Sequence, residues 1–316
     1  MRGFCLDREL RDRLDTNGDN LDLLHLHSVY IPANWRIARH ARCPVVLSPR
    51  NGYSPWVMRR GTLKKSLARL FFEGPMARRT LAIHALSERE RQDCLAYGTP
   101  DRFIVAPNGV DLEGVDAALA GRRRRDERNG PPKLVFLGRL DVLCKGLDLL
   151  LNAVRRVLDA GHEFSLRLVG PPDRGSDLLP GRIARLGLEG LAAVVPPVRG
   201  AEKYCLLADA DLYVQASRWE GIPLSVLEAM ACRTPVLVTR ATNLGDYVDG
   251  AGCGGVCEAT EDGLAAKLVE LLRLAGELPS MGNRARELVE ESFTWNRVAR
   301  TVCDGYEYWL RAGEQH

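Results

Sequence analysis

The feature that most constrains this chain is the regular alternation of short, continuous apolar runs with longer segments of helical periodicity. A run that is apolar at every position predicts a strand covered on both faces, which is typical of parallel sheets. Such strands are expected at residues 21–27, 44–48, 81–86, 103–106, 133–138, 165–170, 191–195, 212–215 and 235–238. Helical spacing between them, as at 146–160, predicts an α/β protein with doubly wound parallel sheets.

A break in this pattern predicts two domains. With 316 residues the chain is long enough to bury two cores. The break falls between Glu113 and Pro132, where the arginine run at 122–125 and an Asn-Gly-Pro-Pro turn interrupt the strands and helices. We expect domains at 1–121 and 133–292, a linker at 122–132, and a C-terminal helix at 293–316 that packs back toward the first domain. Only four expected strands precede the linker, after a helix-like stretch at 5–14, so the first domain looks incomplete.

Composition narrows the class of protein. Hydrophobic residues at 46% and charged residues at 27% are typical of globular proteins, and a net charge of +3 gives no reason to expect nucleic acid. No apolar run is long enough to span a bilayer, and nine scattered cysteines without a CxxC pair suit a reducing compartment. We therefore expect a cytoplasmic protein. Cys253 and Cys257 are interpreted as ordinary thiols rather than half of a metal site, because no second ligand pair is nearby.

The stretch from Gln215 to Ala231 follows an expected strand and opens a helix. Pro223 suits a first helical turn, and Gly221 allows a tight turn and the close approach of a ligand. Free amides at Leu224, Ser225 and Val226, together with the helix dipole, are typical of a phosphate site. We therefore expect this helix start to bind phosphate.

Two carboxylates flank this helix start. Glu228 is expected to accept hydrogen bonds from a ribose, and Glu220 to reach a sugar on the other side. The alternative is that Glu220 caps the helix and that Glu228 is a surface acid. Because Glu228 lies among apolar residues, we expect it to have a partner.

A second phosphate-type element runs from Val135 to Asp148, again as strand, turn and helix. Gly138 and Arg139 leave the strand end, and Lys145 stands at the next helix start. Ligands bind at this edge of open α/β sheets. Two cations there would neutralise a diphosphate leaving group. Each cation alone would be an ordinary surface charge, but their joint position favours a function.

These motifs together resemble the retaining glycosyltransferases of group 1, also called family 4, which have the GT-B fold. The resemblance is carried by Gly138-Arg139-Leu, Lys145-Gly-Leu-Asp148, Glu220-Gly-Ile-Pro-Leu, Glu228-Ala-Met-Ala and Asn108-Gly-Val-Asp111. It implies two Rossmann-like domains that face a cleft. One departure is that the family's usual N-terminal strand and glycine-rich turn are not found in the first domain. A further departure is Arg233, where the family usually has glycine.

The resemblance also implies roles for single residues. Arg139 and Lys145 match the donor-diphosphate cations, and Glu220 matches the catalytic acid near the donor sugar. Glu228 matches the acid on the ribose, Leu224 and Ser225 match backbone phosphate contacts, and Val198 lies where the family holds the base. The co-substrate would be a nucleoside diphosphate sugar, with no metal and no other cofactor.

The sequence indicates the acceptor-binding residues less specifically than the donor-binding residues. By resemblance His27, at a strand end, lies at the cleft, where it would position the acceptor or touch the sugar; a structural hydrogen bond explains it equally well. A metal pair with His25 lacks a third ligand. Arg50, at the next strand end, is the better candidate for an anionic acceptor group. The segment 56–79 mixes cations with leucine and phenylalanine, which fits either a peripheral membrane contact or a core-facing helix with a basic outer side.

We therefore expect a retaining hexosyltransferase that acts on a carbohydrate or lipid-linked hydroxyl acceptor in bacterial cell-surface polysaccharide or glycolipid synthesis. One alternative is a glycoside hydrolase that uses Glu220 and Glu228 as its pair of acids, although hydrolysis needs no phosphate site. Others are a catalytically silent nucleotide-sugar-binding or scaffold protein, and a GT-B epimerase or phosphorylase.

Overall fold

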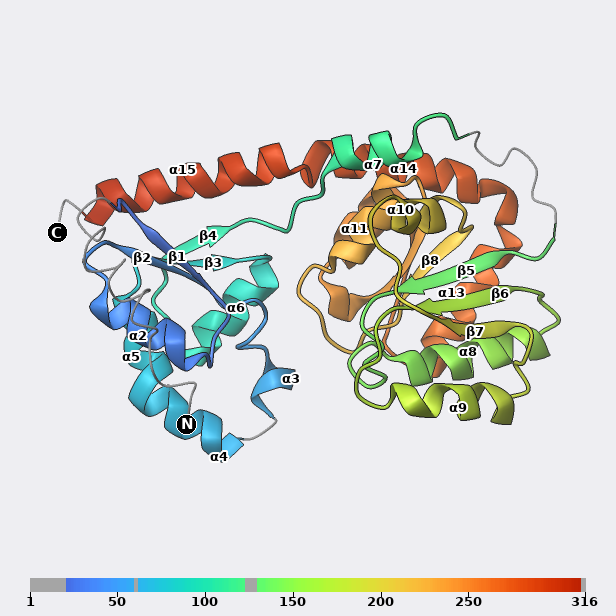
Figure 1. Ribbon diagram of the computed structural model, residues 1–316, viewed down its shortest axis with the longest axis horizontal. Helices are drawn as coiled ribbons and strands as arrows, with labels where there is room; N and C mark the ends of the chain where they lie inside the picture. The colour runs from blue at the N-terminus through green and yellow to red at the C-terminus, as the bar shows by residue number, and fades with distance from the viewer. Residues whose placement is uncertain (1–20, 60–61, 123–129, 314–316) are drawn as a thin grey trace. The chain divides into compact units, whose positions relative to one another are not determined.

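The computed structural model describes residues 21–59, 62–122 and 130–313 of the chain (Figure 1). The chain divides into two compact units. The first unit combines Met1–Pro107 with Val298–His316, and the second unit is Asn108–Arg297. The expected helix at 5–14 lies outside the described residues.

The first unit contains a parallel sheet of four strands in the order β1-β2-β3-β4. The strands are β1 (Leu24–His27), β2 (Val45–Ser48), β3 (Ala82–Ala85) and β4 (Phe103–Val105). Between these strands the described residues of the first unit form the helices α2 (Pro32–His40), α3 (Pro55–Met58), α4 (Thr62–Ala68), α5 (Gly74–Arg79) and α6 (Glu88–Tyr97). His27 pairs in register with Ser48, so the ends of β1 and β2 are level at the carboxyl edge of this sheet.

The second unit contains a parallel sheet of six strands in the order β10-β9-β8-β5-β6-β7. The strands are β5 (Lys133–Leu137), β6 (Ser165–Val169), β7 (Ala192–Val195), β8 (Leu212–Gln215), β9 (Val236–Thr239) and β10 (Gly254–Cys257). The order changes direction at β5 and β8, which pair with each other although they are far apart in sequence. In such sheets ligands bind beyond the carboxyl ends of the strands at this point.

Helices cover both faces of the second sheet (Figure 1). One layer contains α8 (Leu147–Asp159), which packs against α13 (Glu261–Arg273), with α9 (Leu179–Arg185) beside the edge strand β7. The other layer contains α7 (Leu112–Leu119), α10 (Gly200–Ala208), α11 (Leu224–Ala231), α12 (Gly245–Ala251) and α14 (Leu278–Ser292). Leucine and valine side chains from α8, α13 and the central strands form the largest core.

The α/β class predicted from the alternating pattern is confirmed, and every expected strand is present with ends that differ by a few residues at most. The strand β10 and the short helix α7 were missed. β10 begins with Gly254 and Gly255, which are poor strand formers, and pairing with β9 overrides this weak propensity. The short helix α7 lies where the pattern had been read as a break.

The division between the units falls at Pro107 and Asn108, earlier than the expected linker at 122–132, of which 123–129 lies outside the described residues. The reason is that α7 packs against α10 and α11 of the second unit. Asp116 on α7 also forms a bidentate ion pair with Arg286 on α14, at 2.8 Å for both oxygens. These contacts place residues 112–119 with the second unit.

The last helix, α15 (Trp295–Gly313), begins in the second unit and continues on the sheet of the first. The Trp309 indole N–H donates to the Phe103 carbonyl of β4 at 3.2 Å. A Cβ on Gly305 would come within 2.8 Å of the Ile104 side chain, so glycine permits the close approach of helix and strand.

Candidate functional site

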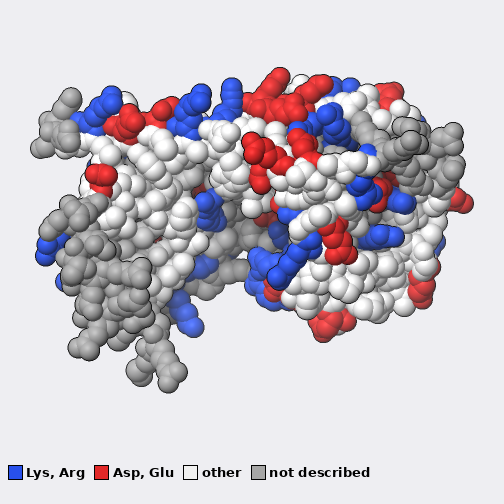
Figure 2. Space-filling view, turned by 45° about the horizontal axis from the view of Figure 1, so that its top comes forward, with Lys and Arg blue, Asp and Glu red and all other residues white. Residues whose placement is uncertain are grey.

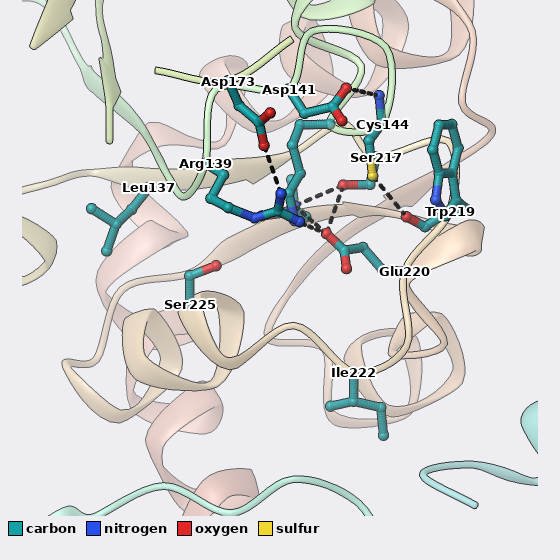
Figure 3. Close-up of polar contacts among 12 residues, drawn as sticks. Leu137, Arg139, Asp141, Cys144, Asp173, Ser217, Trp219, Glu220, Ile222 and Ser225 are labelled. Atoms are coloured by element: carbon teal, nitrogen blue, oxygen red, sulfur yellow. Dashed lines mark hydrogen bonds and ion pairs between the residues drawn. The ribbon is translucent and has the colours of Figure 1, made fainter. Parts of the chain in front are cut away.

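The loop after β5 starts the candidate site at the carboxyl edge of the second sheet. The side chain of Arg139 extends from the strand end and donates to Asp173 at 2.6 Å. In Figure 3 the side chains of Arg139 and Glu220 point toward one another from two different loops. Arg139 is 64% exposed, so its guanidinium remains accessible to an anionic ligand despite this partner.

Gly146 sets the position of Lys145 at the start of α8. Its φ of 63° is in the left-handed region, and a Cβ there would lie 2.0 Å from the carbonyl oxygen of Ala216. Any larger residue would therefore push the loop before α8 away from the end of β8. Glycine at this position lets the two loops touch, which brings Lys145 beside Glu220.

Lys145 and Glu220 form an ion pair in which both side chains are largely buried, at 13% and 16% exposed. The same carboxylate oxygen lies 3.4 Å from the Ser217 hydroxyl and 3.5 Å from the Gln215 amide nitrogen. The Glu220 side chain is therefore held by one cation and two weaker donors. The two residues predicted from separate motifs meet in one cluster.

Behind this pair lies a buried polar network centred on Tyr213. The Tyr213 hydroxyl lies 2.7 Å from the Gln215 side-chain oxygen, 2.8 Å from the Ser225 hydroxyl and 3.0 Å from the Leu137 carbonyl. Burial raises the pKa of Tyr213, so the phenol keeps its proton. The network joins the ends of β5 and β8 to the first turn of α11.

A second ion pair, missed in the sequence analysis, fixes the two loops to each other. Arg218 donates to both oxygens of Asp148 at 2.7 Å and to the Leu143 carbonyl at 3.0 Å. The bidentate geometry is the strong form of this interaction. Asp148 was noticed as part of a motif, but its partner lies 70 residues away, and local sequence carries no signal for such a pairing.

The loop from Glu220 to Pro223 is also held from outside. The Glu220 amide donates to the Ala241 carbonyl at 2.9 Å, and the Asn243 side chain donates to the Glu220 carbonyl at 3.0 Å. Asn108, from the Asn-Gly-Val-Asp motif, donates to the Ile222 carbonyl at 2.6 Å. These bonds fix the backbone that leads into α11.

The start of α11 differs in one detail from the expected phosphate site. The amide of Val226 donates to the Pro223 carbonyl at 3.2 Å, so the expectation of a free amide at Val226 is wrong. The amides of Leu224 and Ser225 remain as donors at the helix start. Gly221 and Gly138 both lie in the loops that border this point.

Glu228, one helical turn further on, pairs with Lys203 of α10 at 2.6 Å. The expected partner of this carboxylate is therefore a protein cation. Burial alone would lower the pKa of Lys203, but the hydrogen bond and charge of Glu228 raise it, so the ammonium form is stabilised. Lys203 was not predicted, because its helix carries no motif.

Val198 lies in the loop between β7 and α10 and is half-buried. It lines a pocket of about 380 Å³ together with Val195, Glu202 and Cys205. The other residues that line this pocket belong to β5, β6, α10 and the two residues after α10. Arg139, Lys145 and Glu220 do not line this pocket.

In the first unit, His27 and Arg50 meet at the carboxyl ends of β1 and β2. The Arg50 guanidinium lies 3.1 Å from Nδ1 of His27. Burial, followed by the charge of Arg50, lowers the pKa of His27. The predicted pair of acceptor-side residues is thus in direct contact.

The described part of the chain contains neither a candidate metal site nor a helix that could span a membrane. Within residues 21–59, 62–122 and 130–313, no group of three or more His, Cys, Asp or Glu side chains is arranged to hold a metal ion. None of the helices in these ranges is both long and apolar enough to cross a bilayer. Figure 2 shows acidic and basic side chains interspersed over the second unit, in keeping with the small net charge.

Comparison with known protein families decides the family. The model of the glycosyl transferases group 1 matches residues 131–274, and the model of Glycosyltransferase Family 4 matches residues 2–113. The chain belongs to the group 1 (family 4) glycosyltransferases. The two matches fall on the two units described above, and the resemblance seen in the sequence is confirmed.

Among curated relatives of this chain, a D-inositol 3-phosphate glycosyltransferase of Kineococcus radiotolerans is 33% identical over 245 residues, which are 70% of this chain and 56% of the relative. An MMP alpha-(1->4)-mannosyltransferase of Mycolicibacterium hassiacum is 32% identical over 213 residues, or 66% of this chain and 49% of the relative. The chain thus spans about half the length of these relatives.

Solved structures establish the fold of this chain. Anabaena Alr3699/HepE in complex with UDP and glucose matches with a TM-score of 0.76 at 18% identity, covering 95% of this chain and 82% of that one. Sucrose-phosphate synthase from Thermosynechococcus elongatus matches with a TM-score of 0.73 at 18% identity, covering 98% and 81%. The predicted α/β fold of GT-B type is confirmed.

Proposed function

We propose that this glycosyltransferase transfers a hexose from a nucleoside diphosphate sugar to a hydroxyl acceptor with retention of the anomeric configuration. The observation that carries the proposal is the meeting of Arg139, Lys145 and Glu220 beside the start of α11. Two cations and a helix start suit a diphosphate, and a carboxylate next to them suits the hydroxyls of a sugar.

In the proposed donor complex, Arg139 and Lys145 contact the diphosphate, with the amides of Leu224 and Ser225 as further donors. Glu228 binds the ribose, Glu220 the donor sugar, and Val198 lies toward the base. Gly221 and Gly138 leave room for the ligand. HepE was crystallised with UDP and glucose, which supports a donor of this chemical class.

The proposed reaction needs no metal and no protein nucleophile. The bond between the anomeric carbon and the diphosphate oxygen breaks, and the acceptor oxygen bonds to the same face of that carbon. The acceptor proton passes to the departing phosphate oxygen. Arg139, Lys145 and the start of α11 stabilise the charge that builds on the leaving group, which is where such donors lower the barrier most.

The hydrolase alternative fits the site less well. Glu220 is paired with Lys145 and Glu228 with Lys203, so both acids face a cation. A glycosidase needs one of its two carboxyl groups to carry a proton, which a neighbouring ammonium disfavours.

For the acceptor, we propose a carbohydrate or lipid-linked hydroxyl in cell-surface polysaccharide or glycolipid synthesis, with peripheral membrane contact at the cytoplasmic face. Leu67, Leu70 and Phe71 are exposed on the segment formed by α4 and the π-helical residues Arg69–Glu73. Of the cations there, Arg69 lies over the Tyr97 ring at 4.7 Å and is exposed. Salt-sensitive sedimentation of the chain with anionic liposomes would support this membrane contact. Absence of such sedimentation would contradict the contact.

The proposal is tested by incubating the purified chain with nucleoside diphosphate sugars and a panel of sugar, inositol phosphate and lipid-linked acceptors. We expect release of nucleoside diphosphate that depends on both substrates, and a product with retained configuration by NMR. Glu220→Gln should abolish the release, whereas Glu189→Gln, an exposed acid elsewhere in the same unit, should not. Absence of release with every donor, or inversion in the product, would contradict the proposal.

A further inference from the structure

The contact between Arg50 and His27 determines where the imidazole carries its proton. Nε and Nη2 of Arg50 lie 3.3 and 3.1 Å from Nδ1 of His27. A guanidinium has only N–H donors and no acceptor. Nδ1 must therefore offer its lone pair, because an N–H at that position would face donors alone.

The protonation of the other ring nitrogen, Nε2, follows from this. A neutral imidazole whose Nδ1 accepts a hydrogen bond carries its proton on Nε2. No described residue forms a hydrogen bond with Nε2 of His27, and the residue is exposed. Nε2–H is therefore a donor that is open to a ligand.

Arg50 is held rigidly enough to impose this state. Arg50 and Asn51 have φ values of 53° and 64°, and two consecutive left-handed residues that are not glycine are strained. Glu90, 2% exposed, supports the turn by accepting from the amides of Asn51 and Leu86, the latter at 2.7 Å. A buried carboxylate thus fixes the loop that carries the guanidinium.

The other side of His27 is fixed by His25, whose ring stacks on it with centroids 4.4 Å apart. His25 belongs to a directed hydrogen-bond chain that ends at the Ala106 carbonyl. That carbonyl only accepts, so His84 donates from Nε2 at 2.9 Å, and its Nδ1 accepts from the Ser48 hydroxyl at 2.9 Å.

The directions of the hydrogen bonds at His25 follow from those at Ser48. The Ser48 oxygen, having donated its proton to His84, accepts from Nε2 of His25 at 2.7 Å. Nδ1 of His25 then accepts from the Tyr306 hydroxyl of α15. Burial lowers the pKa of His25 to about 3 and that of His84 to about 4, which matches the neutral rings that this chain requires.

We propose that Arg50 and His25 are positioning residues that hold His27 as a neutral imidazole protonated on Nε2, so that His27 serves the reaction as a hydrogen-bond donor and not as a base. The part about the reaction rests on the proposed function, whereas the tautomer does not. The proposal also gives Arg50 a role different from that of an anion ligand.

The tautomer is tested by NMR of the full chain labelled with ¹⁵N-histidine, using two-bond correlations between ring protons and ring nitrogens near neutral pH. His27→Gln assigns the His27 signals by their loss. We expect the pattern of an Nε2-protonated ring in the wild type and a mixture of tautomers in Arg50→Met. Arg39→Gln, an exposed arginine whose guanidinium lies over Trp35, should leave the pattern unchanged.

Two results would overturn the proposal: an Nδ1-protonated or cationic His27 in the wild type, or an unchanged pattern in Arg50→Met. Transfer assays form a separate arm. Because glutamine can donate but cannot act as a base, His27→Gln should retain at least tenfold more activity than His27→Ala. Equal loss in both would contradict the donor role, whereas no activity in the wild type would contradict only the proposed function.

Discussion

The two units hold their candidate site residues by different means. In the second unit five cations each face a carboxylate: Arg139 with Asp173, Lys145 with Glu220, Lys203 with Glu228, Arg218 with Asp148 and Arg174 with Asp141. In the first unit His25, Ser48 and His84 are neutral and are joined by hydrogen bonds of fixed direction.

This difference indicates different tasks. An ion pair at a rim can exchange one partner for a diphosphate, because the cation keeps an anionic neighbour before and after binding. A directed chain of neutral groups cannot reverse one bond without reversing the others. The second unit is thus suited to binding and releasing a charged ligand, and the first to presenting fixed donors and acceptors. The following changes test this comparison, from the largest expected effect to the smallest.

Of these changes, removal of the cation in the largely buried pair should have the largest effect. Lys145→Ala deletes a diphosphate contact and leaves Glu220 without its ammonium partner. We expect kcat for sugar transfer to fall about 1,000-fold, which is typical of losing one charge-stabilising group. Lys267→Ala removes a lysine from a surface i,i+3 pair in the same unit and should leave kcat unchanged. A fall of less than tenfold in Lys145→Ala would remove Lys145 from the mechanism.

Gly146→Ala should disturb the contact between the two loops of the second unit. The added Cβ would meet the Ala216 carbonyl, and the alanine would have to adopt a left-handed φ. We expect a loss of about 3 kcal/mol in the free energy of unfolding, measured by urea denaturation. Gly161→Ala, where φ is 82° but nothing lies within 4 Å, isolates the backbone cost and should lose about 1 kcal/mol. Equal losses would mean that the close approach at Gly146 adds nothing to the cost of the substitution.

Glu228→Gln should weaken donor binding more than it slows the reaction. The amide keeps one acceptor for the ribose but loses the charge that holds Lys203. We expect Kd for the donor to rise about 10- to 50-fold, from the value of a hydrogen bond to a charged group. Calorimetry with the nucleoside diphosphate alone provides the measurement. An unchanged Kd would place the ribose elsewhere.

Acid should weaken the first unit through its histidines. The pKa values of His25 and His84 are lowered by burial from 6.5 to about 3 and about 4, so the unfolded chain binds more protons below pH 6.5. Stability is therefore fully present above pH 6.5 and falls below it, by about 1.4 kcal/mol per pH unit for each histidine. Urea unfolding at several pH values should show a shallower fall in His84→Gln than in the wild type. Buried Glu73 and Glu90 are present in both proteins and cancel in this comparison. Parallel curves would contradict the neutral chain.

Sequence patterns predicted the fold well where the signal is local. Continuous apolar runs gave the strands, because a strand buried on both faces has no polar positions. The glycine-rich start of β10 and the short helix α7 escaped, because pairing and packing with distant segments stabilise them. The meeting of Lys145 with Glu220 followed from parallel topology, which brings strand ends to one edge.

The partners of the site residues were not predictable in this way. Lys203 for Glu228, Arg218 for Asp148 and Asp173 for Arg139 all come from segments without a motif. The proton position at His27 depends on Arg50, which follows another strand. The proton positions of the neighbouring His25 and His84 depend on a serine and a carbonyl from other segments, which no single stretch of sequence contains.

The central claim is that the second unit binds a nucleoside diphosphate sugar at the Lys145, Glu220 and Glu228 cluster. Isothermal titration of the purified chain against a panel of nucleoside diphosphate sugars tests it most directly, with Lys145→Ala and Glu228→Ala beside the wild type. The account predicts clear binding of one donor that is lost in both variants. Binding of no donor, or binding that both variants retain, would contradict it.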